Sequence, residues 1–448
     1  MEWTRISQIL CMFGFLKEFR PSEPFIYNYL TSHGKNFTDK QVNQEIYPIA
    51  TYSNFATLVV VFLLTDFLRY KPVIILCGIS GIAAYIILIV GNSIPIIQVV
   101  EFLYGLYFST EVAYYTYIYA KVDKEHYQIV SSYIRSALLF GRFITGVVAQ
   151  LTISFSILNY HELNYLTLLG QVLATLWAVF LPSVKQSVYF HRPEDSPDKD
   201  DCITNSRVTT EGLYPNQSFI QKTKRAYYLL WKDFIKAYTN IHVLKWSFWW
   251  AAASCGYLQV LSYAQIIWET CVKTDDIIYN GAVEAFYTII GGLTVFGVGK
   301  LQLNWELLGE IILSFFSIIE AILLFFMTKT YNIWLQYTLY IIFGVIYHTI
   351  VTIASFEVAK NISEDSFGLI FGINVFLGLT FQSILTFIVI GGNHFLLDIR
   401  GQFTVYSAYF GVLGAIFGVI AVFTITSLCR RQEKLTIWTE VKDDRNSH

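Results

Sequence analysis

Long apolar runs alternate with short polar joints along almost the whole chain. Each run reaches the roughly 20 residues that an α-helix needs to cross a bilayer. Backbone groups that face lipid must satisfy their own hydrogen bonds, so the pattern predicts an all-α membrane protein. Twelve transmembrane helices are predicted, at residues 6–31, 46–68, 72–92, 96–120, 129–155, 162–184, 243–268, 278–300, 304–327, 331–358, 367–392 and 403–429.

The largest polar interruption, residues 185–240, separates six predicted spans from the next six. It begins with the charged string HRPEDSPDKDD, which is typical of a flexible linker. It ends with TKRAYYLLWKDFIK, which predicts an amphipathic helix on the membrane surface, in contact with lipid. The layout resembles the 6+6 pseudo-symmetric halves of major facilitator transporters, with halves at 1–184 and 241–430 and a tail at 431–448.

Lysine and arginine are concentrated in one alternate set of joints, and this asymmetry predicts the orientation in the membrane. The rich set includes Arg69, Lys121, the central linker and the C-terminal tail. Both termini and the linker are therefore predicted to be cytoplasmic. The sequon that starts at Asn36 then falls in the first outside loop, where it is a candidate glycosylation site.

Composition agrees with a membrane protein and excludes several other classes. Of the 448 residues, 54% are hydrophobic and 14% are charged, whereas a soluble domain carries about 25% charged residues. The net charge of −2 gives no basis for nucleic-acid binding. The six cysteines show neither zinc-site nor disulfide-framework spacing. The sequence has no nucleophile elbow, Walker A loop or HExxH pattern, so we expect no enzyme, metal or other cofactor.

Two glutamates, Glu101 and Glu111, lie inside the predicted span QVVEFLYGLYFSTEVAYYTYIYA. A carboxylate inside a bilayer costs several kcal/mol unless it is paired or hydrated, so each is a candidate functional residue. Acids combined with aromatic faces suit an organic cation. Helical spacing places five side chains on one stripe: Glu101, Tyr104, Phe108, Glu111 and Tyr115.

Ion pairing is the alternative explanation for these acids. Arg135 and Arg142 in the next span are near enough in sequence to neutralise Glu101 or Glu111, which would lock the bundle and leave less charge for a ligand. Arg142 could instead contact an anionic substrate directly.

The first span contains a cluster of charges around Pro21 and Pro24. Two prolines three residues apart remove helix donors and predict a kink or break, and broken helices are where transporters place ligand groups. The alternative is that the helix ends near Lys17 and the rest is an outside loop. The charged residues are Lys17, Glu18, Arg20 and Glu23.

The second half offers fewer candidates. Gln259 and Ser262 lie three residues apart on one face of the seventh span and can bond a heterocycle. Glu284 is an isolated acid near the start of the eighth span. His348 in the tenth span could carry a proton, although a lone histidine is more often structural.

Long strings in this chain resemble the reduced folate carrier and thiamine transporter family (solute carrier family nineteen). The resemblance implies a twelve-helix plasma-membrane carrier for a water-soluble vitamin. The matching strings are FGFLKEFRPSEPF, NQEIYPIATYS, LLTDFLRYKPVIIL, QVVEFLYG, EVAYYTYIYA, YNGAVEA, NWELLGE and FGINVF.

Substrate charge separates two branches of that family. Folate carriers place basic residues at positions that match Glu111, Gly344 and Gln382 here, and none of these is basic. The thiamine branch carries an acid and a neutral glutamine at the first and last of these positions, as this chain does. The resemblance therefore favours thiamine, whose thiazolium ring is a permanent cation.

The resemblance to thiamine transporters also implies roles for individual residues. Glu101 would hold the aminopyrimidine, with Tyr104 one turn along. Two further acids would come from the first and eighth spans, Glu23 and Glu284. Two aromatic cavity positions would come from the second and third spans, Tyr47 and Tyr85.

Three positions depart from the thiamine branch. A tryptophan is Ala50 here, an asparagine is Ser262 and a tyrosine is Arg142. A reduced folate or folate-like carrier, or a carrier of another vitamin such as pyridoxine, therefore stays an alternative. A transporter-like protein that signals without transport is a third possibility.

Overall fold

The computed structural model describes residues 3–31, 35–122, 126–184, 219–272, 278–298, 305–362, 366–391 and 397–430. Most of the predicted linker and the 431–448 tail lie outside these residues. All regular secondary structure in the described residues is helical.

Helices that precede the linker form the first half of the bundle. They are α1 (Trp3–Glu18), α2 (Ile26–Thr31), α3 (Asp39–Gln41), α4 (Tyr47–Phe67), α5 (Lys71–Val90), α6 (Ile94–Lys121), α7 (Tyr127–Ser154) and α8 (Tyr160–Val179). A 3-10 turn, η1 (Glu23–Phe25), precedes α2, and a π-helical segment, η2 (Val42–Ile46), precedes α4.

After the linker come α9 (Phe219–Tyr238) and the second half. Its helices are α10 (Ile241–Glu269), α11 (Asn280–Val298), α12 (Trp305–Lys329), α13 (Ile333–Lys360), α14 (Phe367–Thr386) and α15 (Ile399–Arg430). A π-helical segment, η6 (Phe387–Gly391), continues α14.

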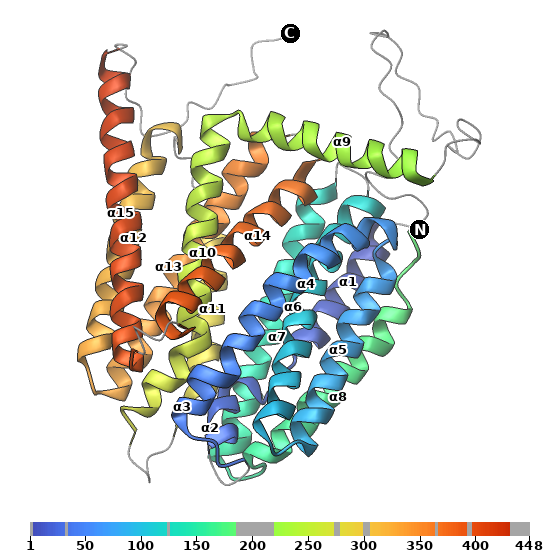
Figure 1. Ribbon diagram of the computed structural model, residues 1–448, viewed down its shortest axis with the longest axis vertical. Helices are drawn as coiled ribbons and strands as arrows, with labels where there is room; N and C mark the ends of the chain where they lie inside the picture. Colours follow the sequence, from blue (N-terminus) through green and yellow to red (C-terminus); the bar gives the residue numbers. More distant parts are fainter. Residues whose placement is uncertain are drawn as a thin grey trace.

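Helix α9 lies across one end of the bundle, where α1 also begins and α15 ends (Figure 1). We call this the α9 end and the opposite end, which holds α2 and α3, the α2 end. Seven described helices are long and apolar enough to cross a membrane: α5, α6, α7, α12, α13, α14 and α15. The other predicted spans correspond to α1 with α2, α4, α8, α10 and α11. The twelve-span prediction is thus confirmed in its order and in the type of each element.

The first span is broken between α1 and α2, as its two prolines predict. Backbone groups freed by a break inside a membrane protein need new partners. Thr145 of α7 supplies one: its Oγ1 accepts a bond from the Arg20 backbone N–H (3.1 Å) and donates to the Glu18 carbonyl (2.8 Å). Thr167 of α8 accepts from the Ser22 backbone N–H (3.0 Å). The break is therefore a built part of the fold and not a helix end that runs into a loop.

The two halves meet along two seams. Helix α7 crosses α11 where a Cβ on Gly146 would lie 2.5 Å from the carbonyl oxygen of Gly281, so both positions need glycine for the backbones to approach. Helix α4 meets α14, where the rings of Phe55 and Phe376 stack with centroids 5.5 Å apart.

Hydrogen bonds also join the halves at the α2 end. The Asn280 side chain donates to the Pro24 carbonyl (3.0 Å) and the Asn28 side chain donates to Glu269 (3.1 Å). Gln265 uses both ends of its amide, since it donates to the Glu23 carbonyl (2.8 Å) and accepts from the Tyr27 backbone N–H (3.1 Å). These bonds hold the α2 end closed in this conformation.

Candidate functional site

Glu18, the last residue of α1, is the centre of a buried ion-pair network. Its carboxylate accepts from Arg142 Nε (2.7 Å), Lys17 Nζ (3.0 Å) and Arg20 Nη2 (3.0 Å). Lys17 also pairs with Glu111 (2.9 Å). The ion-pairing alternative therefore holds for Glu111, but with Lys17 as its partner. Arg142 pairs with Glu18 instead, because the break after α1 leaves Glu18 facing α7.

Arg20 extends this network to two residues implied by the family resemblance. It pairs with Glu23 and donates to the Tyr104 hydroxyl (2.9 Å). Its guanidinium also lies over the rings of Tyr107 and Phe108, 5.5 and 5.6 Å from their centroids. Glu23 and Tyr104 are thus held by a cation of the protein, and Glu23 keeps a side-chain exposure of 31%.

Formal charges within the network cancel. Three cations, each ion-paired, face three carboxylates, so no basic group of the network is left without an acid. The cations are Lys17, Arg20 and Arg142, and the acids are Glu18, Glu23 and Glu111.

Glu101 differs from Glu111 although both lie on one stripe of α6. Its side chain is partly exposed, and its carboxylate has no hydrogen bond or ion pair with any described residue. The phenols that interact with it electrostatically come from three helices, as Tyr47, Tyr85 and Tyr263. The rings of Tyr47 and Tyr263 lie 6.1 Å apart at 55°. Glu101 is therefore an uncompensated acid in an aromatic setting.

Glu284 of α11 is a second uncompensated acid, in the other half. It is partly exposed and accepts a bond from the Tyr340 hydroxyl (3.2 Å), while no described cation lies within ion-pair distance. Tyr340 is itself held edge-on against Trp268, with ring centroids 4.9 Å apart. Arg142 acts on Glu284 electrostatically from the first half. The candidate site thus has one unpaired carboxylate in each half.

Comparison with known proteins decides the family. The family model described as Reduced folate carrier matches residues 1–405. This chain belongs to the reduced folate carrier family. It is 40% identical to thiamine transporter 2 of Homo sapiens over 442 residues, which cover 93% of this chain and 89% of that protein. It is 35% identical to folate transporter 1 of Caenorhabditis elegans, with 95% and 94% covered.

Solved structures show the fold of this family member. The crystal structure of the nucleoside transporter NupG matches with a TM-score of 0.57 at 13% identity, covering 93% of this chain and 98% of that chain. A POT family transporter matches with a TM-score of 0.63 at 11% identity, covering 96% and 97%. At such identities the likeness shows the fold alone, which is the major facilitator fold.

The two polar candidates of the seventh predicted span, Gln259 and Ser262, differ in burial and in hydrogen bonding. Gln259 is fully buried, and its amide nitrogen donates to the Gln382 carbonyl (3.2 Å) and to Thr386 Oγ1 (2.6 Å) of α14. Its role in this conformation is to join α10 to α14. Ser262 is partly exposed and donates to the Leu258 carbonyl of its own helix (2.8 Å), which leaves its lone pairs available.

His348 lies in a cluster of phenols. Its Nε2 contacts the hydroxyls of Tyr257 (3.2 Å) and Tyr287, and these two hydroxyls lie 2.5 Å apart. The ring of Tyr257 stacks on Tyr347 with centroids 3.9 Å apart. This arrangement fits the structural interpretation of His348, since its Nε2 is engaged by two tyrosine hydroxyls.

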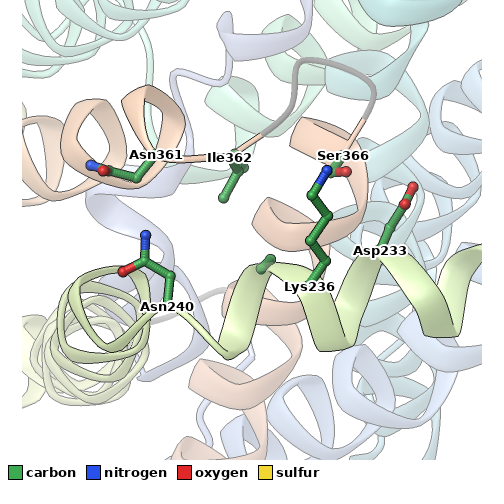
Figure 2. A pocket seen from close by; sticks show the side chains of 7 residues that line it. Asp233, Lys236, Asn240, Asn361, Ile362 and Ser366 are labelled. Atoms are coloured by element: carbon green, nitrogen blue, oxygen red, sulfur yellow. The ribbon is translucent and has the colours of Figure 1, made fainter.

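A separate polar pocket of about 100 Å³ lies at the α9 end (Figure 2). It contains none of the carboxylates of the candidate site. It lies between α9 and the joint that leads from α13 to α14, and it is lined by Asp233, Lys236, Ala237, Asn240, Asn361, Ile362 and Ser366.

Proposed function

We propose that this carrier takes up thiamine across the plasma membrane by alternating access between its two halves. One observation carries the proposal: the basic groups around the site are already paired, while Glu101 and Glu284 are not. The site therefore has an excess of negative charge, which suits a cation. Similarity to thiamine transporter 2 supports the same substrate.

Electrostatics gives the expected scale of recognition. One carboxylate about 4 Å from the thiazolium is worth roughly 4 kcal/mol at an effective dielectric of 20. Ring faces around the acid add cation–π attraction of roughly 0.5–2 kcal/mol each. In this proposal Glu101 accepts from the aminopyrimidine amino group, Glu284 attracts the cation, and Tyr47 and Tyr85 provide ring faces.

We also propose the orientation that the charge asymmetry predicts, with the α9 end cytoplasmic. Asn36 would then face outside, where its exposed side chain is available for glycosylation. The neighbouring Lys35 anchors this loop, since its ammonium donates to the carbonyls of Ile89 (3.2 Å) and Gly91. Burial lowers the pKa of the Lys35 ammonium.

Helix α9 is proposed to contact lipid headgroups. One side packs on the bundle through Leu230 and Phe234. The other side exposes an aromatic stripe, and lysines flank it, as expected for a helix that lies at a membrane interface with anionic lipids. The exposed residues on this side are Lys224, Tyr227, Tyr228, Trp231, Lys232 and Ile235.

Uptake of radiolabelled thiamine into cells that express this chain tests the proposed function. We expect saturable uptake above control cells, and at least a tenfold loss for Glu101→Gln and for Glu284→Gln at equal surface amounts. Glu45→Gln changes an exposed acid of the first half, which also contains Glu101; it is the matched control and should transport normally. Absence of saturable thiamine uptake by the parent chain would reject the proposal.

A reduced folate carrier is the second candidate, and one observation favours it. The Arg142 side chain is 35% exposed although it pairs with Glu18, so it retains surface for an anion. The similarity to folate transporter 1 points the same way. If folate is the substrate, Arg142→Tyr should abolish its uptake; unchanged or enhanced folate uptake would count against this candidate.

A further inference from the structure

Helix α12 carries a carboxyl that the proposed transport site does not use. Glu320 lies on the buried stripe of α12 and is fully shielded from solvent. This helix packs against α15, α13 and α10, away from the interface between the halves. The neighbouring polar groups are already engaged: Ser317 accepts from Trp249 Nε1 (3.0 Å), and the Ala321 carbonyl accepts from Ser407 of α15 (2.7 Å).

Glu320 is exceptional among the fully or almost fully buried acids of the described residues. The other three each have a basic partner: Glu18 has Arg142 (2.7 Å), Glu310 has Lys245 (2.8 Å) and Glu357 has His242 (3.1 Å). Both carboxyl oxygens of Glu320 lack any hydrogen-bond partner in the part of the chain that the structure describes.

An ionised carboxylate in this environment would be unstable. Burial of an unpaired charge costs several kcal/mol even after the surroundings relax, whereas a neutral carboxylic acid costs far less. Glu320 interacts electrostatically with the phenol of Tyr347 of α13. The buried titratable side chains of α10 are Cys255, Tyr257 and Tyr263, and that of α15 is Tyr406, none of which is a cation. Lys245 of α10 is already held by Glu310 (2.8 Å).

We propose that Glu320 is a proton-binding site of the second half, separate from the substrate carboxylates. In this conformation the carboxyl holds its proton; when the packing of α12 against its neighbours admits water, the O–H bond breaks and the proton passes to water. Water is the only other reactant: it accepts the proton and the carboxylate keeps the electron pair of the O–H bond.

The position of Tyr347 connects this proton to the substrate site. Its hydroxyl bonds Ser254 (2.9 Å) and its ring stacks on Tyr257. Tyr257 in turn contacts Tyr287, whose ring lies 5.9 Å from that of Tyr340, the donor to Glu284. A rearrangement at Glu284 therefore reaches the packing around Glu320 through this aromatic cluster, and the proton of Glu320 gives transport a dependence on pH.

Infrared spectroscopy of the purified full chain tests the site without any substrate, so its outcome is independent of the identity of the vitamin. At neutral pH the parent should show a protonated-carboxyl C=O band that Glu320→Gln lacks and Glu310→Gln keeps. Glu320→Asp, which retains the carboxyl, should shift the band and serves if the glutamine variant does not fold. An unchanged band in Glu320→Gln, or in Glu320→Asp where only that variant folds, would overturn the proposal.

Transport then tests the coupling, once the transported vitamin is known. We expect the change of uptake rate with pH to be at least threefold smaller for Glu320→Gln than for the parent, at equal surface amounts. Identical pH profiles for parent and variant would show that the proton at Glu320 is not coupled to transport and would overturn that part of the proposal.

Discussion

Lys17 and Glu111 form a buried ion pair between α1 and α6, with Lys17 Nζ 2.9 Å from the carboxylate. The side chain of Lys17 is only 1% exposed and that of Glu111 is 15% exposed. Tyr115, one turn along α6, donates to the same carboxylate (3.0 Å). Glu111 is thus held by a cation of the protein, whereas the carboxylate of Glu101 has no ion pair with any described residue.

Removing Lys17 should destabilise the protein strongly. Lys17→Met leaves Glu111 without its cation and deprives Glu18 of one of three partners, and breaking a buried pair costs about 3–5 kcal/mol. Thermal unfolding of the purified protein should show a clearly lower midpoint. The double variant Lys17→Met/Glu111→Gln should recover part of the loss; if it is no more stable than the single variant, the pair is not the cause.

Charge at the centre of the network should set substrate preference. Glu18→Gln raises the formal charge of the network by one, because Arg142 and Arg20 lose their shared carboxylate. We expect kcat/KM for thiamine to fall at least tenfold, about 1.4 kcal/mol, as measured by initial uptake rates. Glu45→Gln removes an exposed acid and controls for a general effect of charge. Equal uptake by both variants would contradict the charge argument.

Close approach of α7 and α11 should be required for transport. A Cβ on Gly281 would lie 2.8 Å from the Gly146 carbonyl oxygen and 2.9 Å from the backbone nitrogen of Gln150, so Gly281→Ala must push the halves apart. We expect most uptake to be lost at normal surface expression. Gly292→Ala is the matched control on the same helix, since its Cβ would meet its nearest atom at 3.7 Å. Equal uptake by the two variants would show that the seam tolerates separation.

Glycosylation should depend on Asn36. In cells, Asn36→Gln should reduce the apparent mass of the protein to that of the parent after enzymatic removal of N-glycans, as seen on immunoblots. A parent protein whose mobility does not respond to that enzyme would contradict both this site and the proposed orientation of the α2 end.

Much of the fold follows from the sequence because hydrophobic length determines where helices cross a membrane. The broken first span is equally local, since Pro21 and Pro24 act on their own backbone. The partner of each charged side chain, in contrast, is not determined by its neighbours in the sequence. Arg142 and Glu111 lie close in sequence, yet Arg142 pairs with Glu18 and Glu111 with Lys17, because the packing of α1 against α6 and α7 brings these groups together.

Gln259 shows a second limit of sequence reasoning. A glutamine inside an apolar span can face either a ligand or another helix, and its neighbours along the chain do not distinguish these. Here it faces Thr386. Conversely, Glu18 is one of several charges in the first span, and nothing in the sequence distinguishes Tyr340 from the other tyrosines. Their contacts with Arg142 and with Glu284 exist only in the assembled bundle.

The charge balance of the first half has an electrical consequence. Its six network charges cancel within α1, α6 and α7 and the break between α1 and α2, so under the proposed alternating access they would move as a neutral unit. The remaining acids of the site are Glu101 and Glu284, and a bound monovalent cation adds one positive charge there. Loaded and empty carriers then differ by one elementary charge in the membrane field, worth about 2.3 kcal/mol per 100 mV for full displacement. Under this balance, the membrane potential acts differently on the loading and return steps of the cycle.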